Sequence, residues 1–327
     1  MKSLRRLAPY LLLLILAATG FGVVVKRDAI TDWAVLQNYM PPANVAQLAS
    51  QTTMTSLAKH YFYVNKPQIE GKDAFNTQCT NKIEQSVVLG CFHGNRQGIF
   101  IFNVTTPELD GVQQVTAAHE MLHQAYQRLN SSEKQRVDSM LSSYYKTGLT
   151  DQTIKDQMAS YQKSEPNDVV DEMHSVFGTE ATRLPADLEQ YYRRYFTNRS
   201  VVTGFYTQYQ AAFTSRNQQI MDYDSQLTTQ KQQIDALQAL AMSQLQTLNA
   251  QKSQMDAQKA GGDIHGYNAM VDSYNQMVNQ YNAQLDVLRQ EIDGYNKLVA
   301  ARNAIAVQEQ QLQQDLSSQS LPSVSGQ

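Results

Sequence analysis

The sequence predicts a mainly helical α+β protein with a small antiparallel sheet, one N-terminal transmembrane helix and a long antiparallel coiled-coil hairpin. Three observations lead to this fold class. An uncharged run stands near the N-terminus, two segments rich in β-branched and aromatic residues precede several helical patterns, and two runs of heptad-like spacing surround a glycine pair. We expect the anchor to cover residues 1–27, the folded domain 28–200, the hairpin 201–316 and a disordered tail 317–327.

The overall composition excludes one class of partner. The chain of 327 residues has 27 Lys and Arg against 30 Asp and Glu, which gives a net charge of -3. Because binding to a nucleic-acid backbone needs a basic excess, we expect no nucleic-acid partner. The length is enough for one domain with a sizeable core and an extension beyond it.

The N-terminal run from Leu7 to Val25 has about the length that one membrane span requires. Basic residues flank it, namely Lys2, Arg5 and Arg6 before the run and Lys26 and Arg27 after it. The positive N-terminal end should stay in the cytoplasm, so the rest of the chain is expected outside it, anchored to the cell membrane by a single pass. A cleaved signal peptide is the alternative, although no A-x-A cleavage pattern ends the run. Cys79 and Cys91 can form a disulfide if this compartment is oxidising.

Two helices and a β-hairpin are expected in the first part of the domain. The helices lie on either side of Pro41-Pro42, and the lone His60 near their end is interpreted as packed or exposed rather than as a metal ligand. Residues 86–93 and 98–104 are rich in β-forming residues and predict two antiparallel strands, with His93 incidental at their turn. The second strand is apolar on both faces, so we expect it to be covered on both sides.

A helix is expected from Val112 to Leu129. Its apolar residues recur at helical spacing and form a stripe for the core: Val115, Ala118, Leu122, Ala125 and Leu129. Beside the stripe stand His119, Glu120 and His123 in the pattern H-E-x-x-H. Because residues four apart share a helix face, the two histidines can offer their imidazoles to one metal ion, with Glu120 next to them. A helix with two surface histidines is the alternative interpretation.

Further helices follow. They are expected after an Asn130–Glu133 capping box and up to Gly148, from Thr150 to Gln162, from Pro166 to a stop at Gly178, and from Pro185 onward.

A catalytic zinc site usually has three protein ligands and a water, so one ligand is missing from the motif. Tyr126 and Leu129 stand where a metzincin would have glycine and histidine, which excludes that solution. Glu172 is the first choice, because it borders the apolar stripe of a later helix, where an unpaired carboxylate would be costly. Glu180 and His174 are the alternatives. Glu172 is otherwise interpreted as a surface or salt-bridged carboxylate.

The stretches H-E-M-L-H at 119–123 and D-E-M-H-S-V-F-G-T-E at 171–180 resemble, in this order, the gluzincin class of zinc metallopeptidases. In that class a glutamate from a later helix completes the site. The resemblance covers about residues 86–196 and implies a zincin-like fold and a Zn²⁺ cofactor. The thermolysin-type E-x-x-x-D is not present, since Val176 stands four residues after Glu172. The succession of anchor, hairpin, HExxH helix and coiled coil also resembles bacterial membrane-anchored proteins of uncharacterised activity.

The expected function is a membrane-anchored zinc metallopeptidase with a peptide or protein substrate. His119, His123 and Glu172 would hold Zn²⁺, whose charge acidifies a bound water. Glu120 is expected to act as the general base that takes the proton from this water. Asp171 and Glu180 are expected to orient the ligating histidines from outside the ligand set. The candidates for an oxyanion donor are His174, Tyr144, Tyr145 and Tyr161.

Two other functions fit the same pattern. One is a non-catalytic envelope scaffold that acts through its coiled coil and carries a structural or lapsed metal site. The other is hydrolysis of cell-wall peptides. The presence of Glu120 favours catalysis over a structural site, because a structural site does not need a carboxylate at this position.

The C-terminal part has the spacing of a coiled coil. Apolar residues between Thr203 and Lys259 keep three-four spacing, and Gly261-Gly262-Asp263 interrupts the pattern. In the second run, one residue in seven belongs to a first set, namely Tyr267, Tyr274, Tyr281, Leu288 and Tyr295. A second set follows each of these by four positions, namely Val271, Val278, Leu285, Ile292 and Val299. This is an a/d seam, and the tyrosines are interpreted as seam fillers rather than as a binding surface. A protein partner is possible through this hairpin.

Overall fold

The structure, a computed structural model, describes residues 27–79, 88–94, 96–164 and 166–318. The expected anchor lies outside the described residues except for its last residue, and most of the expected tail lies outside them as well. Among the helices in the described ranges, none is long and apolar enough to cross a bilayer. The chain divides into two compact units, which we call unit 1 (residues 1–210 and 314–327) and unit 2 (residues 211–313).

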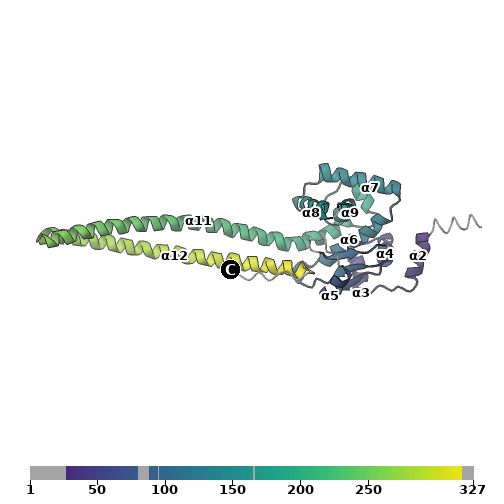
Figure 1. The fold of residues 1–327 in the computed structure, drawn as a ribbon, viewed down its shortest axis with the longest axis horizontal. Coiled ribbons are helices and arrows are strands. Elements are labelled where there is room, and N and C mark those ends of the chain that lie inside the picture. The colour runs from purple at the N-terminus through teal and green to yellow at the C-terminus, as the bar shows by residue number, and fades with distance from the viewer. Residues whose placement is uncertain (1–26, 80–87, 95, 165, 319–327) are drawn as a thin grey trace, which may run out of the picture. The chain divides into compact units, whose positions relative to one another are not determined.

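Unit 1 is mainly helical, with a small sheet (Figure 1). Its elements are α2 (Arg27–Leu36), α3 (Ala43–Gln51), α4 (Ser56–Tyr63), β1 (Gln68–Glu70), α5 (Lys72–Gln78), β2 (Gly90–Phe92), β3 (Ile99–Phe102), the 3-10 helix η1 (Pro107–Leu109), α6 (Val112–Gln127), α7 (Ser131–Ser143), the π-helix η2 (Tyr144–Gly148), α8 (Gln152–Ser164), α9 (Val169–Thr179) and α10 (Ala186–Tyr192). The expected helix before Pro41-Pro42 is α2, whereas two helices, α3 and α4, follow it.

The sheet has the strand order β1-β3-β2. β2 and β3 pair antiparallel, with Cys91 opposite Phe100, so the expected hairpin is confirmed. β1 pairs parallel with β3, with Ile69 opposite Ile101, so the expectation of a purely antiparallel sheet was wrong. β1 is only three residues long and two of them, Gln68 and Glu70, are polar, so neither length nor alternation distinguishes it from a loop.

The core of unit 1 lies around α6. β3 is buried along its whole length, as expected for a strand covered on both sides. α6 packs on the sheet, while Phe75 of α5 packs against Phe102 with ring centroids 5.5 Å apart. The other neighbours of α6 are α3, α4 and α9. Because helices and sheet surround it, α6 is buried on most of its circumference, and not on one stripe alone.

α9 packs closely against α6, and Gly178 makes this possible. A Cβ atom at this position would lie 2.4 Å from Cδ1 of Leu122 and 2.7 Å from Cε1 of Tyr192. The expectation that Gly178 stops the helix was wrong, since α9 continues to Thr179, and the helix starts at Val169 instead of Pro166. Glycine is therefore needed here for close packing rather than for a helix end.

The capping box of Asn130 and Glu133 is confirmed at the start of α7.

Unit 2 belongs to a long helical hairpin made by α11 (Arg199–Ala260) and α12 (Ile264–Leu316), which run side by side (Figure 1). The turn between the two helices contains Gly262 with φ of 81°. The buried residues of α11 in this unit recur every seven positions, at Ile234, Ala241, Leu248 and Met255. The tyrosines at the predicted seam of α12 are half-buried. This burial has the period of a coiled-coil seam and agrees with the expected role of the tyrosines as seam fillers.

Candidate metal centre

Two neighbouring helices bring three potential metal ligands together. His119 and His123 lie one turn apart on α6, and Glu172 lies in the first turn of α9. Nε2 of His119 is 3.5 Å from Oε2 of Glu172, and Nε2 of His123 is 3.5 Å from Oε1 of the same carboxylate. One ligand atom from each residue lies within 4.8 Å of the other two. Among the described residues this is the one such group of three His, Cys, Asp or Glu side chains.

The packing of α6 on α9 explains why these side chains converge. Ala118, Met121 and Leu122 are fully buried on α6, and Val176 and Phe177 are fully buried on α9. The close approach at Gly178 keeps the two helix backbones near each other. The site therefore lies at the edge of a rigid helix pair, which is the kind of support that holds ligands in a fixed geometry.

The donor set fits a divalent metal ion such as zinc. Two imidazole nitrogens and one carboxylate oxygen are the ligands of many catalytic zinc sites, with one coordination position left for water. Oε2 of Glu172 is buried, and its contact with Nε2 of His119, at 3.5 Å, is too poor in geometry to count as a hydrogen bond. Burial acts to raise the pKa of Glu172, but the neighbouring His123 and His119 outweigh it and hold the pKa below its usual value. A buried, ionised carboxylate with an unsatisfied oxygen is what a metal ion would satisfy.

Asp171 contacts the second nitrogen of one of these histidines. Nδ1 of His123 lies 2.9 Å from Oδ1 of Asp171, so a proton on Nδ1 is donated to this carboxylate and Nε2 stays directed at Glu172. Burial acts to lower the pKa of His123, but the carboxylates of Glu172 and Asp171 prevail and raise it to about 10. Glu180 accepts a hydrogen bond from Gln157 (3.3 Å). Its burial raises its pKa to about 7, and the charge of the nearby His119 acts against this rise.

Glu120 is buried beside the three ligands and is not one of them. Its burial raises its pKa above the ordinary value for glutamate. β2 lies directly against it, because a Cβ atom on Gly90 would be 2.5 Å from Oε1 of Glu120. The ring of Phe92 stacks on His123, with 6.4 Å between centroids and 2° between planes. β2 therefore forms a wall of the site.

His174 lies outside the ligand group. It is fully buried in a cluster of aromatic rings, and its Nε2 lies 2.8 Å from the hydroxyl of Tyr191. The rings of Tyr126, Tyr192 and Tyr195 are also in contact with it. Burial lowers the pKa of His174 to about 3, so it is neutral at physiological pH. Neither His174 nor Glu180 joins His119, His123 and Glu172 as an alternative ligand.

The tyrosines that sequence analysis named as oxyanion donors lie in different surroundings. The hydroxyl of Tyr144 donates to the carbonyl of Arg183 (2.8 Å). The hydroxyl of Tyr161 is near enough to Glu172 to help the two histidines lower the pKa of that carboxylate. Tyr145 is half-buried against the core. Of the three, Tyr161 therefore has its polar group at the ligand set.

Gly90 and Phe92 were not among the predicted site residues. No local pattern marks them, because their importance comes from the position of β2 over α6 and not from their neighbours in the sequence. No protein-family model, curated protein or solved structure matches this chain.

Proposed function

We propose that the protein is a zinc metallopeptidase of the gluzincin type, anchored in the cell membrane and acting outside the cytoplasm. The observation that carries this proposal is the convergence of His119, His123 and Glu172 within 4.8 Å, with the buried Glu120 beside them. The uncharged run from Leu7 to Val25 supports the anchor.

The disulfide between Cys79 and Cys91 supports a location outside the cytoplasm. Disulfides of this kind persist in oxidising compartments and are rare in the cytosol. Both cysteines of the chain are used in this bond, and the described residues hold no free cysteine.

His119, His123 and Glu172 would hold the zinc ion. When bound, zinc lowers the pKa of a water molecule and polarises the substrate carbonyl. Glu120 accepts the proton of the attacking water and passes it to the leaving amine, and its raised pKa makes it a better proton acceptor at neutral pH. Asp171 holds His123 with Nε2 available for coordination. Tyr161, next to Glu172, is the best placed of the candidate donors to stabilise the developing negative charge.

The test measures bound zinc and cleavage of a mixed peptide pool by the full chain and three variants. Glu120→Gln should keep stoichiometric zinc and lose cleavage by a factor of about 10² to 10⁴, since proton transfer contributes this much. Glu172→Ala should lose zinc. Glu108→Gln, which changes an exposed carboxylate in η1, should behave as the wild type.

Two results would contradict the proposal at different points. A wild-type chain that takes up no zinc would remove the enzyme function. Stoichiometric zinc in Glu172→Ala would show that the third ligand is another group.

The second candidate is a non-catalytic scaffold that acts through the helical hairpin. The long packed pair of α11 and α12, with its heptad burial, favours this function independently of the metal site. With a structural metal site it predicts zinc in the wild type and in Glu120→Gln, and with a lapsed site it predicts no zinc in either. In both cases neither protein cleaves peptides. Cleavage by the wild type alone therefore separates the two functions.

A further inference from the structure

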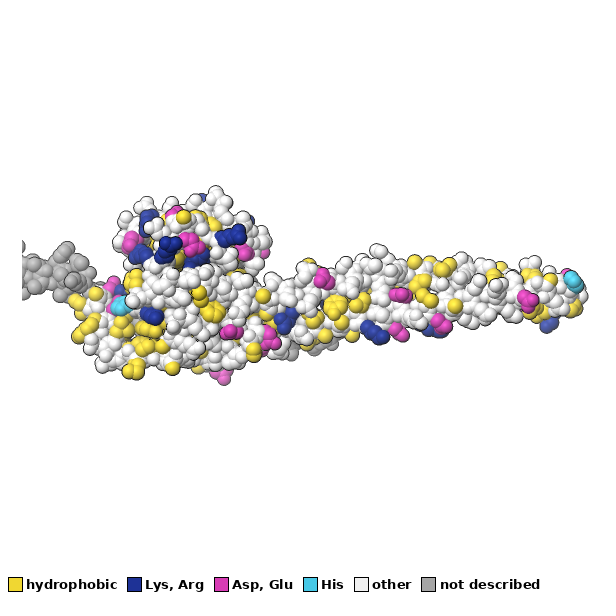
Figure 2. Space-filling model, turned by 180° about the vertical axis from the view of Figure 1, so that it is seen from behind, with side chains coloured by type: hydrophobic (Ala, Val, Ile, Leu, Met, Phe, Trp, Pro, Cys, Tyr) yellow, Lys and Arg dark blue, Asp and Glu magenta, His cyan; other side chains and the backbone are white. Residues whose placement is uncertain are grey.

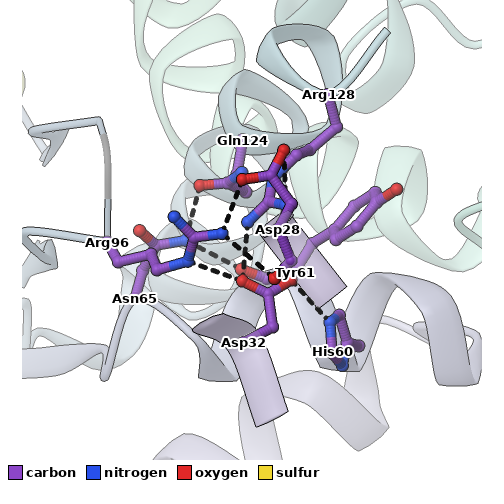
Figure 3. Close-up of polar contacts among 8 residues, drawn as sticks. All are labelled: Asp28, Asp32, His60, Tyr61, Asn65, Arg96, Gln124 and Arg128. Carbon is purple, nitrogen blue, oxygen red and sulfur yellow. Dashed lines mark hydrogen bonds and ion pairs between the residues drawn. The ribbon is translucent and has the colours of Figure 1, made fainter. Parts of the chain in front are cut away.

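One side of α2 is held to the rest of unit 1 by ionic contacts around a buried aspartate (Figure 3). We call this group the Asp32 cluster; it consists of Asp28, Asp32, His60, Arg96 and Arg128. Asp32 is 2% exposed. Its Oδ1 accepts hydrogen bonds from Nε of Arg96 (2.6 Å) and from Nη2 of Arg128 (2.9 Å), and its Oδ2 lies 2.9 Å from Nε2 of His60. Asp28, one turn earlier, also contacts Arg96 (2.9 Å). These contacts give His60 a structural role, in agreement with the expectation that it is not a metal ligand.

The partners in the Asp32 cluster come from three different elements. Arg96 belongs to the turn between β2 and β3, Arg128 follows the last residue of α6, and His60 is in α4. A charge this deeply buried and bonded on several sides tolerates little movement. The rotation of α2 about its own axis is therefore fixed, and its Asp28–Asp32 side faces the rest of unit 1.

The opposite side of α2 carries exposed apolar residues. Trp33 is 63% exposed and Ile30 is 48% exposed, and the two lie three positions apart on one helix face. Met40, in the segment after the helix, is 88% exposed. Figure 2 shows hydrophobic side chains gathered at the end of unit 1 where α2 lies. Exposed apolar groups that cluster in this way mark an interaction surface.

The position of α2 in the chain indicates what covers this surface. Within the described residues the helix begins at Arg27, two positions after Val25, where the uncharged run ends. If that run spans a bilayer, α2 starts at the height of the lipid headgroups. Tryptophan prefers this depth, because its ring is apolar and its indole N–H needs a polar partner. Trp33 is the one tryptophan of the chain.

We propose that α2 lies on the surface of a lipid bilayer and inserts Ile30, Trp33 and Met40 into the boundary between headgroups and acyl chains. This is the binding mode of an interfacial helix that has one apolar and one polar face. Here the polar face is bound to unit 1 through the Asp32 cluster, so the bilayer sets the orientation of α6 and of the β2–β3 turn. The inference rests on the membrane anchor of the proposed function and is independent of peptide hydrolysis.

The fluorescence of Trp33 tests the proposal directly. The full chain is reconstituted into vesicles of phosphatidylcholine and phosphatidylglycerol, with bromine atoms at defined depths on the acyl chains. We expect Trp33 emission to be shifted to the blue, quenched at least twofold by bromines near the headgroups, less by bromines near the bilayer centre, and protected from acrylamide in water.

Two results would overturn the proposal. Quenching by acrylamide without quenching by bromolipid would place Trp33 in water. Protection from both quenchers would place it against protein, such as a second copy of this chain.

A control variant carries its tryptophan elsewhere in unit 1. In Trp33→Phe combined with Ser160→Trp, the new tryptophan is on an exposed position of α8, which lies on the other side of unit 1 from α2 in Figure 1. We expect no bromolipid quenching in this variant. Equal quenching of both proteins would overturn the proposal, because the contact with lipid would not be specific to α2. The wild-type measurement remains decisive if this variant fails to fold.

Discussion

His123 and Asp171 form a histidine–carboxylate pair between α6 and α9, with Nδ1 of the imidazole 2.9 Å from Oδ1 of the carboxylate. This contact uses the nitrogen that points away from the three-ligand group, and Nε2 is left 3.5 Å from Glu172. A carboxylate behind a metal-binding histidine fixes the orientation and the protonation of the ring. Asp171 is thus placed to set the metal affinity of a site to which it supplies no ligand.

We expect Asp171→Asn to lower zinc affinity by a factor of about 10 to 100, which is the usual effect of losing such a partner. The measurement is a competition titration against a chelator of known affinity. Asp168→Asn is the matched control, because Asp168 is exposed and its side chain makes no capping hydrogen bond to α9. Equal affinities for wild type and Asp171→Asn would mean that the pair has no influence on the metal.

Gly90 controls the space around Glu120. A Cβ atom added here would lie 2.5 Å from Oε1 of Glu120 and 2.5 Å from Cγ2 of Thr116, so the Glu120 carboxylate must move. We expect Gly90→Ala to retain zinc, since no ligand is touched, and to cut peptide cleavage at least about tenfold, since general bases act only within hydrogen-bond reach. Parallel zinc and cleavage assays measure this. Gly71→Ala is the control, because nothing lies within 4 Å of the added atom; full activity of Gly90→Ala would contradict the prediction.

Local periodicity was enough to predict α6, the β2–β3 hairpin and the capping box of α7. In each case the signal lies within a few consecutive residues: helical spacing around His119 and His123, β-forming residues in two adjacent runs, and Asn130 three positions before Glu133. The two histidines of the site could be paired from sequence for the same reason, because a single helix turn places them together.

Features that depend on packing between distant segments were harder to predict. Glu172 was separated from Glu180 and His174 only by the argument that it borders an apolar stripe, and the geometry of α9 on α6 was needed to bring it to the histidines. Gly178 was assigned to a helix end, although its role is to admit Leu122. β1 pairs with a strand far along the chain, and no turn signal announces a parallel partner.

The disulfide of Cys79 and Cys91 holds β2, the strand that contacts Glu120 and His123, to the end of α5. The bond closes a loop with a sequence separation of 12, and loops of this size contribute on the order of 3 kcal/mol to the free energy of unfolding. We expect reduction to lower the melting temperature and to reduce cleavage as β2 loosens. Thermal unfolding and peptide cleavage, each with and without a phosphine reductant, measure both effects.

A double variant without the two cysteines controls for effects of the reductant on other parts of the protein. Cys79→Ser combined with Cys91→Ser should match the reduced wild type and should not respond to the reductant. A wild type whose cleavage and melting temperature are unchanged on reduction would show that the bond does not stabilise the wall of the site.

The Asp32 cluster predicts a defined dependence on pH. Burial acts to raise the pKa of Asp32, but hydrogen bonds from Arg128, Arg96 and His60 outweigh it, and the pKa lies below its ordinary value of 3.8. Because the folded-state pKa is depressed, the ionised carboxylate stabilises the fold at pH values above that ordinary value. The stabilisation is lost as the pH falls from there through the folded-state pKa.

We therefore expect Asp32→Asn to lower the free energy of unfolding at pH 7 by on the order of 3 kcal/mol, since it leaves two partly buried arginines without the charge that they share. The difference between wild type and variant should begin to shrink below about pH 4 and should vanish once the pH has fallen through the lower folded-state pKa, where Asp32 of the folded chain becomes protonated. Denaturant unfolding at a series of pH values measures both quantities. Asp28→Asn is the control: Asp28 also pairs with Arg96, but its side chain is 68% exposed, so its loss should cost less than about 1 kcal/mol. Equal losses for the two variants would mean that burial does not distinguish these carboxylates and that the Asp32 cluster does not hold α2 in place.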